Sequence, residues 1–148
     1  MKKTNTILAV TLVLMCFFAT TAFSQGIVDS LKEGKKLVEA SQLLIADGQV
    51  LQNCTGQDRG KMIDEGNRMI SKGRDIISGG ALMATAVGRE DGLKIGQTMI
   101  SGGNMLLKKG KQQGELTAED KEKIKKLGND MVGLGNKMLS KGKIMTGG

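Results

Sequence analysis

The sequence predicts an all-α protein: an antiparallel four-helix bundle built from glycine-containing heptad repeats and preceded by a signal peptide. Three observations predict this fold. Large apolar residues recur in pairs every seven residues, a Gly or Ser stands between successive pairs, and no segment after the signal alternates as a strand would. The chain has 148 residues. Export would leave about 124, enough for one domain, residues 25–148.

Residues 1–24 are typical of a signal peptide. Two lysines near the start precede an almost wholly apolar stretch, residues 7–18, which is too short for a comfortable membrane span. Ala22 and Ser24 are small residues at the −3 and −1 positions of a cleavage site, which makes Gln25 the first mature residue. We therefore expect a periplasmic or extracellular protein. The alternative, a retained membrane anchor, also leaves the folded part outside the cytoplasm.

Each predicted helix follows one rule: heptad position a is Gly or Ser, and positions d and e are large and apolar. The first helix, about residues 27–52, has its small residues at Gly34, Ser41 and Gly48. The second, about residues 58–85, has them at Gly66, Gly73 and Gly80. Between the two helices the pattern is interrupted at residues 53–56, where Asn, Thr and Gly favour a turn.

The third and fourth helices repeat the rule. The third, about residues 91–112, has Gly96, Gly103 and Gly110, and the fourth, about residues 118–146, has Gly128, Gly135 and Gly142. Residues 85–91 are expected to be a connection because glycine interrupts the pattern there. The fourth helix has the clearest start, with Thr117 as N-cap and Glu119 and Asp120 in the first turn, where the helix dipole favours negative charge.

The helices also resemble one another in sequence. The eight residues from Gly66 read Gly-Asn-Arg-Met-Ile-Ser-Lys-Gly, and those from Gly135 read Gly-Asn-Lys-Met-Leu-Ser-Lys-Gly. The eight residues from Gly96 are a third variant. The spacing between successive copies is about 30 residues, one helix plus one turn, which is typical of a helical repeat. We interpret the similarity as internal duplication.

The heptad glycines carry a large cost. Gly inside a helix is about 0.5–1 kcal/mol less favourable than Ala, so the nine from Gly66 to Gly142 forfeit roughly 5–9 kcal/mol, comparable to the stability of a whole domain. Their place within the apolar stripe indicates that they face the core. There they would let neighbouring helices approach closely, with large d and e residues of the partner filling the space. Association within lipid is disfavoured, because every helix carries frequent charges.

Composition excludes several functions. The chain has no His, Trp, Tyr or Pro, which excludes histidine catalysis, histidine metal sites and most aromatic stacking on nucleic acid. General acid–base groups near neutral pH and a nucleophile–base pair are missing, so we do not expect an enzyme, a cofactor or a nucleic-acid partner. One cysteine, Cys54, remains after export; it is expected to be a free thiol or to form an intermolecular disulfide.

The formal net charge is +7, and all of the positive excess that remains after export lies in the C-terminal half. Two lysine clusters there could contact an anionic surface such as lipid headgroups or acidic polysaccharide, although a solvated lysine face is the commoner arrangement. The clusters comprise Lys108, Lys109, Lys111, Lys121, Lys123, Lys125 and Lys126.

Methionine is abundant, and thioether sulfur suits Cu(I). Most of these residues occupy position d, where Met fills gaps in a core, so packing is the preferred interpretation. Those that remain after export are Met62, Met69, Met83, Met99, Met105, Met131, Met138 and Met145.

These observations lead to a ranked expectation of function. First is a non-enzymatic exported helical protein that acts by binding or by self-association as a homo-oligomer, in the cell envelope or outside the cell. Second is an amphipathic protein that binds a membrane or envelope surface with its lysine-rich C-terminal half. Third is a soft-metal binder that holds Cu(I) with its methionines.

Overall fold

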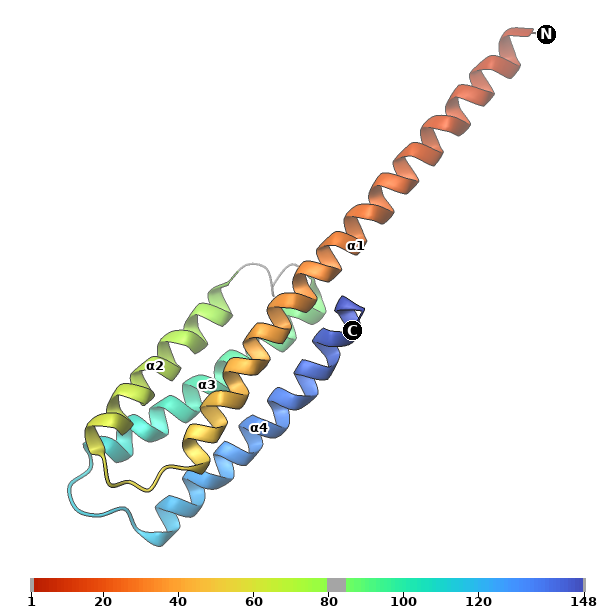
Figure 1. Cartoon of the computed structure of the whole chain (residues 1–148). Helices are drawn as coiled ribbons and strands as arrows, with labels where there is room; N and C mark the ends of the chain where they lie inside the picture. The colour runs from red at the N-terminus through yellow and green to blue at the C-terminus, as the bar shows by residue number, and fades with distance from the viewer. Residues whose placement is uncertain (1, 80–84, 148) are drawn as a thin grey trace.

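The computed structural model describes residues 2–79 and 85–147, with side chains from Gln25 onward (Figure 1). Over this part of the chain it contains four α-helices and no strand. They are α1 (Lys2–Gln52), α2 (Arg59–Ser78), α3 (Ala86–Lys111) and α4 (Ala118–Thr146). The prediction of an all-α chain with four helices is confirmed. Gly80 and Met83 lie outside the described residues.

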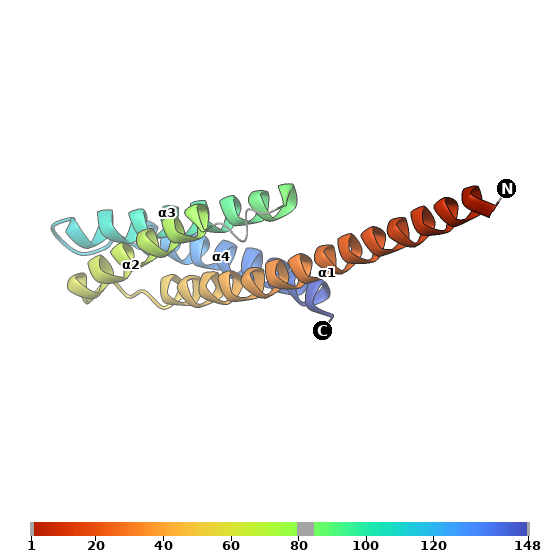
Figure 2. The ribbon, with the colours of Figure 1, turned by 90° about the horizontal axis from the view of Figure 1, so that it is seen from above.

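The helices pack in two pairs. α1 packs along α4, α2 packs along α3, and α3 also contacts α1 and α4. Seen from above, α1 and α4 form one layer and α2 and α3 the other (Figure 2). Within each pair the helices are antiparallel, since Gly34 lies opposite Gly142 while Gly48 lies opposite Gly128. The packing of these pairs is consistent with the predicted bundle.

The first helix is longer than expected. The sequence placed its start near residue 27, whereas α1 begins at Lys2 and runs without interruption through the segment predicted as a signal peptide. Nothing around Gly26 stops a helix, because a single interior Gly costs only about 1 kcal/mol and no Pro is present. Within the described part of the chain, no helix combines the length and the apolar character needed to cross a membrane.

The start of α3 corrects a second expectation. Residues 85–91 were expected to be a connection, but Thr85 is the N-cap and the helix begins at Ala86. The Thr85 hydroxyl accepts a hydrogen bond of 3.0 Å from the backbone N–H of Gly88. Gly88 and Gly92 are buried in the helix rather than placed in a turn, so glycine here is a small packing residue and not a breaker.

The other boundaries lie closer to expectation, except at the end of α2. That helix ends at Ser78, before the predicted end near residue 85, and Gly79 is extended. α3 ends at Lys111, and α4 has its predicted bounds. The predicted cap of α4 is confirmed, because the Thr117 hydroxyl accepts a hydrogen bond of 3.1 Å from the N–H of Asp120.

Inside each pair the two backbones touch at glycine. A Cβ atom built on Gly73 would lie 2.6 Å from the carbonyl oxygen of Gly96, and one built on Gly96 would lie 2.6 Å from the carbonyl oxygen of Gly73. Gly66 and Gly103 face each other in the same way. Real Cβ atoms do not approach oxygen this closely, so the seam between α2 and α3 requires a residue without a side chain at these positions.

The seam between α1 and α4 has the same construction with one exception. Gly48 faces Gly128, but Ser41 faces Gly135. Ser41 is fully buried, and its hydroxyl donates a 2.5 Å hydrogen bond to the carbonyl oxygen of Leu37 in the preceding turn. Because its own helix satisfies this hydroxyl, the serine can stand in a seam without leaving a polar group unpaired.

The large apolar residues at heptad positions d and e contact different parts of the molecule. The e residues lie beside the glycines of the partner helix; Ile100, for example, lies over Gly73, and Ile45 over Gly135. The d residues point between the two pairs and form one buried core. Its nearly inaccessible members from positions d are Leu37, Leu44, Leu51, Met62, Met69, Met99, Leu106, Ile124, Met131 and Met138.

Candidate binding surfaces

The predicted packing residues form the interior of the molecule. All of them that the structure describes are buried, in the two seams just described, so none is available to a ligand. They are Gly34, Ser41, Gly48, Gly66, Gly73, Gly96, Gly103, Gly110, Gly128, Gly135 and Gly142.

Most of the methionines that the structure describes are also buried in the interior. Met69, Met99 and Met131 are completely buried in the core between the pairs, and Met62 and Met138 are nearly so. All five belong to the apolar core between the pairs, where they act as packing residues. In the described part of the chain, no three His, Cys, Asp or Glu side chains are grouped so that they could hold a metal ion.

The two lysine clusters meet at one end of the bundle. We call this the loop end; it consists of residues 53–58 and 112–117 with the adjoining helix ends (Figure 1). Lys108, Lys109 and Lys111 lie in the last turn of α3, and the other cluster lies in the first turns of α4. Helices joined by a short connection bring their adjacent ends together, so two clusters separated in sequence share one surface.

Two of these lysines are engaged in ion pairs. Lys109 Nζ lies 2.7 Å from Asp120 Oδ1 and links α3 to α4. Lys123 pairs with Glu119 one turn earlier in α4. The hydrogen bond from Lys109 lowers the pKa of the Asp120 carboxyl below its ordinary value. The remaining members, Lys108, Lys111, Lys121, Lys125 and Lys126, are exposed.

Arg59 fixes the connection at the same end. It is the first residue of α2, and its guanidinium donates hydrogen bonds to the carbonyl oxygens of Lys109 and Gly114. The carbonyl groups near the end of α3 have no partner within the helix, and a cation there also complements the helix dipole. Arg59 therefore holds residues 112–117 against α2 and positions the basic surface.

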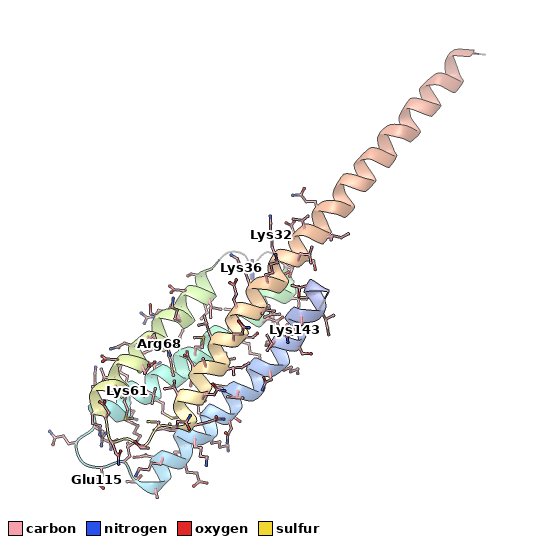
Figure 3. The ribbon with its side chains drawn as sticks, in the orientation of Figure 1. Lys32, Lys36, Lys61, Arg68, Glu115 and Lys143 are labelled. Carbon is pink, nitrogen blue, oxygen red and sulfur yellow. The ribbon has the colours of Figure 1, made fainter. Side chains whose placement is uncertain are left out.

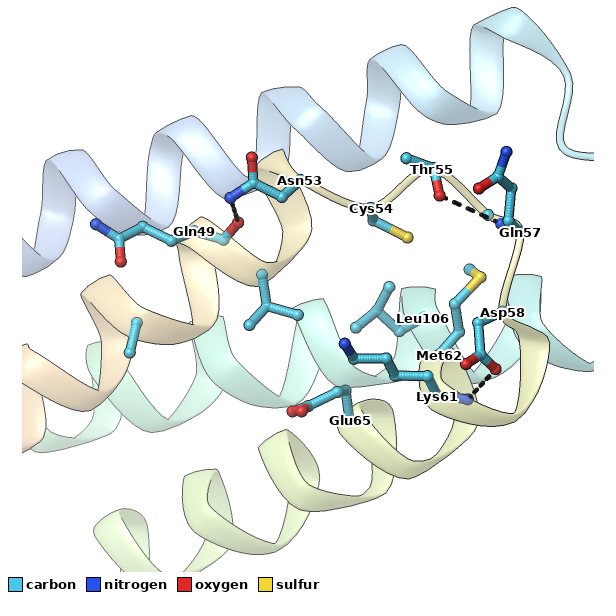
Figure 4. A pocket seen from close by; sticks show the side chains of 13 residues that line it. Gln49, Asn53, Cys54, Thr55, Gln57, Asp58, Lys61, Met62, Glu65 and Leu106 are labelled. Carbon is cyan, nitrogen blue, oxygen red and sulfur yellow. Dashed lines mark hydrogen bonds between the residues drawn. The ribbon is translucent and has the colours of Figure 1, made fainter.

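α1 and α2 do not pack along their lengths. Between them, near the loop end, lies a cavity of about 530 Å³ (Figure 4). α1, the 53–58 loop, α2 and α3 all contribute to its walls. The residues that line it are Ala46, Gln49, Val50, Asn53, Cys54, Thr55, Gly56, Gln57, Asp58, Lys61, Met62, Glu65 and Leu106.

Cys54 is a free thiol in this lining. It is half-buried, and in Figure 4 its sulfur points from the loop toward the cavity. The predicted loop at residues 53–56 is confirmed, since the segment between Gln52 and Arg59 is not helical. An intermolecular disulfide through Cys54 remains a prediction.

A partly buried ion pair links α1 and α2 next to the cavity. Arg68 lies on α2 (Figure 3). Its Nη2 lies 2.5 Å from Asp47 Oδ1 of α1, and its Nε donates to Glu65 Oε2 at 2.6 Å. Asp47 is completely buried, and its second oxygen, Oδ2, has no hydrogen-bond partner among the described residues. Burial raises the pKa of Asp47, and the hydrogen bond from Arg68 only partly opposes that shift.

Sequence reasoning missed this pair. The signal available to it was the spacing: Glu33, Ala40 and Asp47 lie seven residues apart, on one face of α1, next to the apolar stripe. All three are buried, and Glu33 accepts a 2.7 Å hydrogen bond from the Thr85 hydroxyl. Charged residues at a fixed heptad position would have indicated a polar contact between the helix pairs.

At the end opposite the loop end, α1 extends past the other helices (Figure 1). Its seam with α4 ends where Gly34 meets Met145 and Thr146. One heptad earlier, Ile27 and Leu31 continue the same face of the helix beyond the end of α4. They are 48% and 37% exposed, so this apolar stripe has no covering helix within the described structure.

Comparison of the chain with protein families, with curated proteins and with solved structures found no match. The candidate surfaces therefore rest on geometry and chemistry alone. They are the lysines of the loop end, the cavity between α1 and α2, and the uncovered stripe of α1.

Proposed function

We propose that this chain is a non-enzymatic exported protein that acts by self-association, with the uncovered stripe of α1 as its contact with a second copy. The observation that carries the proposal is the continuation of the α4-facing side of α1 by one heptad, through Ile27 and Leu31, past the point where α4 ends. Val28 adds a third exposed apolar side chain beside them.

The positions of the apolar residues in the stripe indicate what kind of partner would cover it. In the seam, Gly34 of α1 accommodates the end of α4, and Val38 covers Gly142. Ile27 and Leu31 hold the equivalent positions one heptad earlier. Because Ile27 is large where the seam has Gly34, the face suits an apolar helix packed through side chains, further away than α4 is in the seam. The same segment of a second copy is such a helix, and pairing two copies would cover both stripes at once in an isologous contact.

Light scattering and native mass spectrometry of the purified protein test this proposal. We expect an oligomer that Leu31→Lys converts to monomer at the same concentration. Leu43→Lys is the matched control, because Leu43 is an equally exposed Leu of α1 away from the stripe. A monomeric wild-type protein, or equal effects of the two substitutions, would contradict self-association through this face.

A second candidate function has its own observation. The exposed lysines of α3 and α4 share the loop end, which supports binding of this end to an anionic membrane or envelope surface. Flotation with anionic vesicles at low and high salt tests it. We expect binding at low salt that Lys111→Glu with Lys121→Glu removes, whereas the control Lys137→Glu, an exposed substitution in the middle of α4, retains most of it. Absence of binding at low salt would exclude the candidate.

Binding of Cu(I) by the methionines has less support. The most deeply buried of them pack in the core along the length of the bundle. Metal analysis after anaerobic Cu(I) loading tests this third candidate, and a stoichiometry near zero would exclude it.

A further inference from the structure

We infer that the second copy pairs with the uncovered stripe of α1 in antiparallel orientation, and that removal of residues 1–24 creates the space it needs. This pairing rests on the self-association proposed above and adds its geometry and the step that controls it. Two features of the fold lead to it. α1 continues without a break on both sides of the stripe, and α4 occupies the same face of α1 from Gly34 onward (Figure 1).

A parallel partner does not fit this face. Such a helix would lie beside Ile27 and Leu31 and then continue toward the loop end, because α1 is one continuous helix. The place beside α1 is already filled at Gly34, where an added Cβ atom would lie only 2.8 Å from Met145 Cβ of α4. A parallel partner running along the stripe would therefore collide with the end of α4.

An antiparallel partner fits only if its own α1 begins near Gln25. It would run outward from the bundle, with its first residue next to the end of α4. The free part of this face spans residues 25–33, about 13 Å of helix, and a partner segment of the same length fills it. Earlier residues that continued the helix, as α1 does from Lys2, would extend into the place of α4. The predicted cleavage after Ser24 leaves a helix of the length that fits.

The same register matches the apolar side chains. When Gln25 of one copy lies level with residue 33 of the other, the two-fold axis passes level with residue 29. Ile27 of each copy then lies opposite Leu31 of the other, so both exposed side chains of the stripe are covered. Asp29 lies about 160° around the helix from each of them, so the two Asp29 carboxylates do not face each other.

The helix ends complement each other in this arrangement. α4 ends at Thr146, and the carbonyl groups of its last turn carry the negative end of the helix dipole. The cleaved α1 would begin with the positive end of its dipole, an ammonium group and unpaired N–H groups. Antiparallel pairing brings these two opposite ends together at each side of the contact.

Two further exposed apolar residues lie at this end of the bundle. Asp91 of α3 and Lys141 of α4 form an ion pair, and Val87 lies one turn before Asp91 while Ile144 lies one turn after Lys141. Val87 and Ile144 are therefore both just beyond the ion pair, on the side where α1 projects, and they are 54% and 74% exposed. A partner helix whose first turn rests on the end of α4 would cover part of this surface.

Inserts near the mature N-terminus test the limit on length. Native mass spectrometry is carried out on the exported protein over a range of concentrations, after its first residue has been identified. Seven residues of Ala, Glu and Lys between Gln25 and Gly26 would lengthen the helix by about 10 Å, and we expect loss of the dimer. The matched control is an insert of seven Gly and Ser residues, which can bend away from α4 and should leave the dimer intact.

Disulfide formation tests the orientation. Ile27→Cys and Leu31→Cys are made separately in a Cys54→Ser background, which removes the one cysteine that remains after export. We expect a several-fold higher yield of linked dimer from an equal mixture of the two variants than from either variant alone, because position 27 of one copy faces position 31 of the other. A parallel pair would instead link each variant to itself.

The outcomes separate this geometry from self-association itself. A dimer that Leu31→Lys dissociates but that the helical insert leaves intact would overturn the antiparallel fit, while self-association through the stripe would stand. Equal yields of linked dimer from the mixture and from the separate variants would also overturn it. A monomeric wild-type protein would overturn both, because the stripe would then have no second copy to bind.

Discussion

The seams inside the helix pairs and the interface between the pairs hold the molecule together in different ways. In the seams, glycines bring two backbones into direct contact, as Gly73 and Gly96 do. Between the pairs, contact is made by large flexible side chains such as Met69 and Met99, and by ionic bridges such as that from Arg68 to Asp47. A backbone contact cannot yield to an added atom, whereas a long side chain can change rotamer. The seams should therefore be the less tolerant region.

A single methyl group in a seam tests this difference most directly. In Gly73→Ala the new Cβ would meet the Gly96 carbonyl at 2.6 Å and Ile100 Cγ1 at 2.8 Å. Ala favours the helix by about 0.5–1 kcal/mol, but overpacking against backbone costs about 1–3 kcal/mol. We expect a net loss of about 1–2 kcal/mol in the free energy of unfolding, measured by urea denaturation.

Gly133→Ala is the control for that experiment. Gly133 is exposed in the middle of α4, and a Cβ atom built there has no neighbour within 4 Å. The same change should stabilise the protein by about 0.5–1 kcal/mol through helix propensity alone. If the two substitutions shift the urea midpoint in the same direction, the difference in tolerance between the seams and the rest of the molecule does not exist.

Breaking the bridge between the pairs should cost less. Arg68→Met keeps the stem of the side chain but leaves Asp47 buried without its cation. Removing one partner of a fully buried pair typically costs 3–5 kcal/mol, but Arg68 is 40% exposed, so solvent reduces the loss to about 1 kcal/mol. Urea denaturation measures it. Adding Asp47→Asn should restore most of the lost stability; a double variant no more stable than Arg68→Met would show that the buried charge is not the cause.

The smallest effects are expected in the pH dependence, where two carboxylates should have opposite signs. Asp47, which faces Arg68 and Glu65, has a raised pKa in the native state, so the folded chain takes up its proton before the unfolded chain does. Relative to Asp47→Asn, the wild-type free energy of unfolding should rise as the pH falls toward about 4 and then level off. At higher pH the ionised, buried carboxylate is a constant penalty.

Asp120 should behave in the other way. Its native pKa is lowered, first of all by the hydrogen bond from Lys109, so its contribution is fully present above the ordinary pKa of Asp, about 4, and is lost as the pH falls through the lowered value. Urea denaturation of wild type, Asp47→Asn and Asp120→Asn across the acid range measures both slopes. Slopes of the same sign would contradict the contrast between the fully buried Asp47 and the half-buried Asp120.

Much of the fold could be predicted because its signals are local. The apolar pairs every seven residues indicated helices, and the N-cap at Thr117 marked the start of α4 to the residue. The predicted helix boundaries were wrong where glycine can either end a helix or pack inside one. Gly88 was interpreted as a breaker, yet it lies inside α3 behind the cap at Thr85, and near Gly26 the sequence contains nothing that ends α1. Composition cannot distinguish a glycine that ends a helix from one that packs it.

The candidate sites were less predictable, since they depend on distances between segments. The distribution of charge along the sequence indicated the lysine clusters but not their meeting at the loop end, and nothing local placed Cys54 and Lys61 around one cavity. The cavity lies between α1 and α2 because α2 packs along α3 and not along α1. Which helix packs on which depends on all contacts of the folded chain together, so the sequence of a single helix does not reveal its neighbour.

The sequence by itself determined the helices and the positions at which bare backbone is available, because helix periodicity and the absence of a side chain are local properties. Only the tertiary structure decided which glycine meets which, that α1 joins α4 while α2 joins α3, and that Asp47 is buried opposite Arg68. All four helices carry nearly the same repeat, so the repeat alone cannot choose partners. Pairing depends on connection lengths and on the few polar contacts between pairs, which act only once the helices are together.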